Sequence, residues 1–143
     1  MPVSTGASAA HPALAGYAQR HGLSLGAFRT DGRLTLRFDR RHRLQIRPAA
    51  NGRIAFAARL MDLSARALDV EQTLLHLAAM GAGLLRDHAA GLCVDEAEQT
   101  VVLQQVLPSD ADVALLESEL AAFVNTLAFW MHACAFARLV RPA

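Results

Sequence analysis

The chain has 143 residues, of which 53% are hydrophobic and 19% are charged, and its formal net charge is +1. This length predicts a single domain with its own core. Its two cysteines are too few for a disulfide framework and match no metal-ligand spacing. The excess of apolar over charged residues favours a protein that covers part of its surface with a second subunit or a bound partner.

The charges are unevenly distributed along the sequence, and every basic side chain is arginine. The segment from Arg29 to Arg66 holds ten arginines and three acids, a balance of +7, whereas the rest holds four arginines and ten acids, a balance of −6. Such a chain could associate with itself or bind an acidic partner. The alternative is a solvated face of a sheet.

Residues 1–10 are small and polar, and no basic stretch precedes an apolar one. This segment is predicted to be a disordered tail and not a signal peptide. A single domain is expected over residues 11–141. Its first helix should begin near His11, because Pro12 suits a first turn, and it should end at Gly22.

Residues 28–60 predict three antiparallel strands, because apolar side chains occupy even positions and arginines occupy odd ones. The sheet should therefore have one dry face and one face rich in guanidinium groups. The dipeptides Asp31-Gly32 and Asn51-Gly52 supply the positive φ angles of tight turns. The even positions are Phe28, Leu34, Leu36, Phe38, Leu44, Ile46, Ile54, Phe56 and Leu60, and the odd ones are Arg29, Arg33, Arg37, Arg43, Arg47, Arg53 and Arg59.

A second helix is expected from Asp69, which would cap it together with Gln72 three residues later. Glycine inside a helix costs about 1 kcal/mol relative to alanine. Keeping Gly81 and Gly83 therefore favours the close approach of another backbone, although a kink or an early end at Gly81 is the alternative. We expect a dimer contact through one face of this helix, made by Leu77, Ala78, Gly81, Ala82 and Leu85.

Residues 91–94 and 100–107 predict two more strands, joined by an acidic turn at 95–98. Residues 100–103 show no clean alternation, so this strand is expected to be covered on both faces. The last helix should be capped by Ser109 or Asp110, with Asp112 in its first turn. It carries a main apolar stripe (Val113, Leu116, Leu120, Phe123, Leu127, Trp130, Cys134) and a second one (Leu115, Ala122, Phe129, Phe136).

The order of elements is thus α-βββ-α-ββ-α, which predicts an α+β domain with helices packed on a twisted antiparallel sheet. The sheet can cover only the main stripe of the last helix, so the second stripe needs the first helix, another subunit or a client. Residues 120–137 carry no charge, but Asn125, Thr126 and His132 interrupt them. A membrane-spanning helix is therefore not expected.

No catalytic constellation is present in the sequence. The six histidines form no pair at metal-ligand spacing with a nearby cysteine or carboxylate, and no glycine-rich phosphate loop precedes a helix. Cys93 lies in a predicted strand without a nearby histidine, which indicates a structural thiol. The sequence therefore predicts neither an enzyme nor a metal or cofactor site. Nucleic-acid binding is also disfavoured, because no aromatic residue lies between the arginines to stack on bases.

Five phrases, in this order, resemble the class I chaperones of bacterial type III secretion, the Tir chaperone family. They are Leu34-Thr-Leu-Arg-Phe-Asp39, Arg43-Leu-Gln-Ile-Arg47, Thr73-Leu-Leu-His-Leu77, Val101-Val-Leu-Gln-Gln-Val-Leu-Pro108 and Leu120-Ala-Ala-Phe-Val-Asn-Thr-Leu-Ala-Phe-Trp130. The resemblance covers roughly residues 12–135. The chain departs from the family's usual acidic charge, and it has glycines in the second helix where bulkier residues are expected.

The resemblance implies a cytoplasmic bacterial homodimer without catalytic activity. Such a protein holds the non-globular N-terminal segment of a secreted effector in an export-competent form, through apolar grooves and added β-strands. For this chain we expect a client groove that includes Leu14, Tyr17, Leu34, Leu36 and Phe38. The rival interpretation is a regulator or adaptor that binds an acidic protein through Arg33, Arg37, Arg43, Arg47, Arg53 and Arg59.

Overall fold

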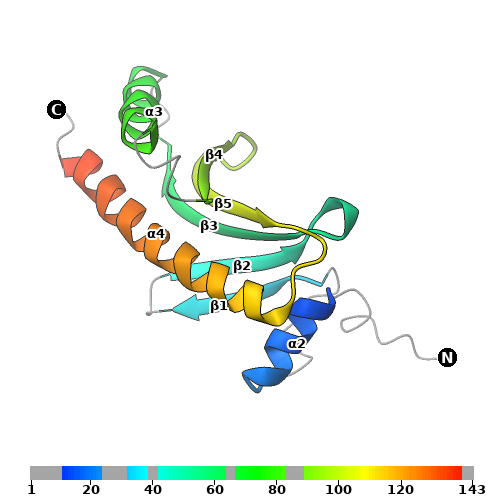
Figure 1. Cartoon of the computed structure of the whole chain (residues 1–143). Helices are drawn as coiled ribbons and strands as arrows, with labels where there is room; N and C mark the ends of the chain where they lie inside the picture. Colours follow the sequence, from blue (N-terminus) through cyan, green and yellow to red (C-terminus); the bar gives the residue numbers. More distant parts are fainter. Residues whose placement is uncertain (1–10, 24–31, 39–41, 64–66, 83–88, 140–143) are drawn as a thin grey trace.

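The computed structural model describes residues 11–23, 32–38, 42–63, 67–82 and 89–139, which form an α+β domain (Figure 1). Five strands form one antiparallel sheet in the order β1-β2-β3-β5-β4. The strands are β1 (Leu34–Phe38), β2 (His42–Pro48), β3 (Ile54–Asp62), β4 (Gly91–Asp95) and β5 (Thr100–Leu107), and the helices are α2 (Pro12–Arg20), α3 (Ala67–Ala82) and α4 (Val113–Leu139). The predicted fold class and order of elements are confirmed.

The three helices occupy different places around the sheet (Figure 1). The long helix α4 crosses one face of the sheet, α2 packs beside its first turns, and α3 lies near its C-terminal part. The opposite face of the sheet, called here the outer face, carries no helix in the described part of the chain. Ligands can therefore approach either the outer face or the seams between helices.

Helix α2 has the predicted limits. The His11 side chain accepts a hydrogen bond from the Ala13 N–H at 3.1 Å, which caps the first turn. Gly22 follows the helix with φ +67°, the left-handed conformation that favours glycine after a C-terminus. Leu14 points into the core and is fully buried.

The even-position pattern is confirmed for the dry face of the meander that β1, β2 and β3 form. Five of its side chains have no exposed surface, namely Leu34, Leu44, Ile46, Ile54 and Phe56. The Asn51-Gly52 turn has the predicted positive φ angles, 60° and 73°. Phe28 and Arg29 lie outside the described residues. The sequence pattern therefore identified which face of β1 to β3 meets α4.

Two strand predictions are wrong. A register shift between Arg59 and Met61 inserts one residue into β3, so Met61 is buried and Leu60 is only half-buried. Strand β5 does alternate, because Gln105 is buried on the helix side and Val106 is 49% exposed on the outer face. The strand is thus covered on one face only.

The helix starts also differ from expectation. The Asp112 carboxylate accepts a hydrogen bond from the Leu115 N–H at 2.8 Å, so Asp112 is the N-cap of α4 and neither Ser109 nor Asp110 caps it. Helix α3 begins at Ala67, which places Asp69 in its first turn and not at the cap. The main stripe of α4 is confirmed: Leu116, Leu120, Phe123, Leu127, Trp130 and Cys134 are all buried.

Candidate functional site

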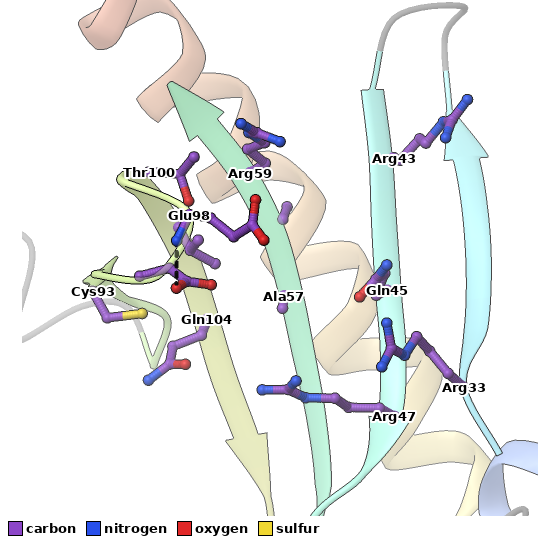
Figure 2. A pocket seen from close by; sticks show the side chains of 13 residues that line it. Arg33, Arg43, Gln45, Arg47, Ala57, Arg59, Cys93, Glu98, Thr100 and Gln104 are labelled. Atoms are coloured by element: carbon purple, nitrogen blue, oxygen red, sulfur yellow. Dashed lines mark hydrogen bonds between the residues drawn. The ribbon is translucent and has the colours of Figure 1, made fainter. Parts of the chain in front are cut away.

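A hollow of about 650 Å³ lies on the outer face of the sheet (Figure 2). The hollow is lined by side chains of β2, β3, β4 and β5 and by Arg33, which directly precedes β1. The curved sheet itself therefore forms its floor. The lining residues are Arg33, Arg43, Gln45, Arg47, Ala57, Ala58, Arg59, Cys93, Asp95, Glu98, Thr100, Val102 and Gln104. The sequence predicted the arginine face, but it could not show that the face is hollowed.

The strand register arranges these side chains in rows across the sheet. In the register of β1 and β2, Arg37 lies opposite Arg43 and Thr35 lies opposite Gln45. Gln45 lies in turn opposite Ala57 of β3, and Ala57 lies opposite Gln104 of β5. A neutral row thus runs across the sheet at Gln45, Ala57 and Gln104.

Arginines stand on both sides of this neutral row. Arg43 precedes Gln45 by two residues and Arg47 follows it by two, so both point to the same face. Figure 2 shows Arg33 and Arg47 on one side of the row and Arg43 and Arg59 on the other. Within the described residues, neither Arg43 nor Arg47 forms an ion pair. Their charge is therefore available to a ligand.

The β4–β5 end of the hollow is acidic. Asp95 accepts hydrogen bonds from the backbone N–H groups of Ala97 and Glu98, at 3.1 and 3.2 Å, which orders the hairpin turn. Partial burial, with a further contribution from the Asp95 charge, raises the pKa of the Cys93 thiol, whereas the Arg47 charge opposes this shift. Cys93 is thus held as a protonated thiol near neutral pH, which agrees with a structural role.

A second hollow of about 450 Å³ lies between α2 and α4. Its lining combines an apolar wall with a charged rim and consists of Tyr17, His21, Glu117, Leu120, Ala121, Val124 and Asn125. The Glu117 carboxylate accepts from Arg20 at 3.0 Å and lies 3.2 Å from the His21 ring nitrogen, with the Tyr17 ring 4.4 Å from that imidazole. The hydrogen bond from Arg20 lowers the pKa of Glu117.

The predicted client-groove residues divide into two groups. Leu14 and Leu34 have no exposed surface, so in this conformation they support the core and cannot touch a client. Tyr17 lines the hollow between the helices, and Leu36 is half-buried. The side chain of Phe38 lies outside the described residues. Of this set, the structure leaves Tyr17 and Leu36 accessible.

The predicted dimer face of α3 mixes two sides of the helix. Leu77 is buried in the core of its own chain, so it cannot make the predicted contact, whereas Ala78 is exposed. Leu75, which the sequence reasoning did not select, is 64% exposed and lies on the same side as Ala78 and Ala79. The side chains of Gly81, Ala82 and Leu85 lie outside the described residues.

The second apolar stripe of α4 is uncovered in the described structure. Leu115 is 37% exposed and Phe129 is 46% exposed, and Ala122 between them is exposed as well. Phe136 has no described side chain. Residues Val113–His132 are long and apolar enough to cross a membrane by length and composition, a test that core helices also pass. Here one stripe of this helix packs on the sheet.

Comparison with known proteins gives the fold first. The chain shares the fold of a chain in the ExsC–ExsE complex, with a TM-score of 0.66, 20% identity and coverage of 92% of this chain and 96% of the other. A chain of the HopA1–SchA chaperone–effector complex has a TM-score of 0.62 and 17% identity, and the match covers 82% of this chain and 88% of the other. A chain in the complex of the Yersinia pestis type III secretion chaperone SycH with a fragment of YscM2 has a TM-score of 0.56 and 15% identity. This match covers 84% of this chain and 98% of the other. The fold is therefore that of chains solved in secretion chaperone complexes.

The sequence comparison identifies the family. The family model of the Tir chaperone protein (CesT) family matches residues 13–131, which is most of the chain. The protein therefore belongs to this family, and the predicted resemblance is confirmed. A search of curated proteins returned no significant match.

Proposed function

We propose that the protein is a non-catalytic chaperone that binds the N-terminal, non-globular segment of a type III secretion effector and keeps it soluble and ready for export. The family match over residues 13–131 carries this proposal. The exposed apolar side chains on α4 and α3 support it, because a chain that covers neither Phe129 nor Leu75 has apolar area left for a partner. We place the protein in the bacterial cytoplasm, where such a client is synthesised.

The hollow between α2 and α4 is the proposed anchor site for an apolar client side chain. Tyr17 and Val124 supply its apolar wall, and the paired charges of Arg20 and Glu117 mark its rim. In the described structure, β1 pairs only with β2 and β4 only with β5, so the sheet has two open edges. An extended client could add a strand to either edge.

The test is co-expression with the N-terminal segment of a secreted protein encoded beside this chain. We expect the segment to be recovered in soluble form with the chaperone, and to be insoluble or degraded without it. Ala121→Asp should reduce its recovery, because Ala121 is exposed and lines the hollow. Ala128→Asp is the matched control, since Ala128 is exposed on the same helix but outside the hollow. Equal recovery with both variants would remove this hollow from the client site.

We further propose a homodimer that forms through the exposed side of α3. Leu75 and Ala78 lie on this side, and a second copy would cover them. Leu75→Arg should give monomers by light scattering, because it places a charge in an apolar contact. Leu115→Arg, on a different exposed apolar site, should stay dimeric. A dimer that survives Leu75→Arg would show that α3 does not form the interface.

A further inference from the structure

We propose that the hollow on the outer face of the sheet binds an acidic segment of a polypeptide, and we call this site the arginine trough. It is defined by Arg33, Arg43, Arg47 and Arg59 around a floor of Gln45, Ala57 and Gln104. The proposal rests on the proposed function only in taking a polypeptide as the ligand. It assigns a charge preference that the apolar hollow between α2 and α4 does not provide.

The first argument is the spacing of the arginine rows. Arg43 and Arg47 are four residues apart on β2, which separates their Cα atoms by about 13 Å. The floor residue Gln45 lies midway between them, and its neighbours Ala57 and Gln104 continue the floor across β3 and β5. A chain that crosses the strands along this row would therefore have guanidinium groups on both flanks.

The second argument is the chemistry of the floor. Gln45 and Gln104 carry side-chain amides that both donate and accept hydrogen bonds, which suits the N–H and C=O groups of an extended peptide backbone. Ala57 between them is small and leaves room above the sheet. Guanidinium groups bind carboxylates through paired N–H donors. Backbone binding by the floor and carboxylate binding by the walls are thus combined in one site.

The third argument is the distribution of charge within the hollow. Among the described residues, Arg43 and Arg47 have no ion pair, whereas Arg59 pairs with Asp62. Acidic groups are confined to the β4–β5 end, where Asp95 and Glu98 lie. The acidic side chains of a guest should therefore face β1 and β2. This polarity would also fix the direction in which the guest lies.

The outer face disfavours a nucleic-acid guest. Its described strand positions hold Thr35, Gln45, Ala55, Ala57, Val102, Gln104 and Val106 beside the arginines, and no aromatic side chain. Single-stranded nucleic acids gain much of their affinity from stacking on aromatic rings. The trough has charge for phosphates but no stacking surface. We therefore assign a polypeptide rather than a nucleic acid.

The experiment measures binding of short labelled peptides to the purified full chain by fluorescence anisotropy. One unstructured peptide alternates Glu with Ser, and a matched peptide replaces each Glu with Gln. The Glu peptide should bind and the Gln peptide should bind at least about tenfold more weakly. Binding of the Glu peptide should also weaken as salt rises from about 0.02 M to about 0.3 M, because solvent-accessible charges are screened.

The test variant is Arg43→Gln with Arg47→Gln, since both side chains are exposed and neither forms a described ion pair. It should lose about tenfold in affinity for the Glu peptide or more. Arg53→Gln is the control, because Arg53 is exposed on the β2–β3 turn and does not line the hollow. That control should bind within about twofold of the natural protein.

Several results would overturn the proposal. They are no binding of the Glu peptide, equal binding of the Gln peptide, full affinity in the double variant, and tighter binding of a single-stranded oligonucleotide of equal charge. A change of the double variant to monomers by light scattering would assign the trough to a second copy instead. Recovery of the secreted client is measured separately, so a natural protein that recovers its client but does not bind the Glu peptide would reject the trough and leave the proposed chaperone function standing.

Discussion

Two phenylalanines of α4 lie six residues apart and should respond very differently to replacement by alanine. Phe123 has no exposed surface and packs edge-on against Phe56, with ring centroids 5.5 Å apart. Its replacement removes a fully buried ring and leaves a cavity, so Phe123→Ala should lower the free energy of unfolding by about 3–5 kcal/mol. Loss of the ring pair contributes about 1 kcal/mol of that cost.

Phe129 belongs to the second stripe and is 46% exposed, with one edge contact to Trp130. Its ring is only partly removed from water by its own chain, so Phe129→Ala should cost about 1 kcal/mol. Urea unfolding of both variants and the natural protein, at one protein concentration, measures the two values. Equal losses, or a larger loss for Phe129, would show that the two stripes are not divided between core and surface as described.

Three further predictions concern α2 and the β4–β5 end of the trough. A methyl group on Gly16 would lie 2.7 Å from a Val113 methyl, so Gly16→Ala should cost about 1–2 kcal/mol, and Val113→Ala should relieve the loss in the double variant. Glu117 has a lowered pKa, so its carboxylate adds stability above its ordinary pKa of 4.5 and loses this contribution as pH falls through the lower folded value. The difference in melting temperature between the natural protein and Glu117→Gln should therefore vanish in acid; a difference that does not depend on pH would contradict this. For Cys93, removal of the nearby carboxylate by Asp95→Asn should lower the thiol pKa and speed alkylation by iodoacetamide near pH 8, and an unchanged rate would place Asp95 too far away to act.

Much of the fold could be predicted because the apolar pattern has a simple period. The alternation at Leu34, Leu44 and Ile54 identified the dry face of the meander, and the main stripe of α4 identified its buried side. The bulge between Arg59 and Met61 could not be predicted, since an inserted residue leaves no composition signal of its own. The alternation of β5 was hidden because Val102, which lines the hollow on the outer face, is as apolar as the buried Val101 and Leu103. The inward position Gln105 is polar, and its amide is paired with Glu119 of α4.

The candidate site was harder to predict than the fold. The odd-position arginines were visible in the sequence, but the register that places Gln45, Ala57 and Gln104 in one row depends on pairing between distant strands. The client groove was partly misassigned because apolar residues on a helix or strand do not reveal which of them face outward. Leu14 turned out to be core, and Leu75 turned out to be surface.

Export of the client in living bacteria tests the central claim most directly. The gene for this chain would be deleted in a strain with an active type III secretion system, and the culture supernatant assayed for the co-purifying client and for one unrelated substrate. We expect export of the client to fall sharply and its cytoplasmic pool to become insoluble or degraded, while export of the unrelated substrate continues. Unchanged export and solubility of the client would contradict the chaperone assignment.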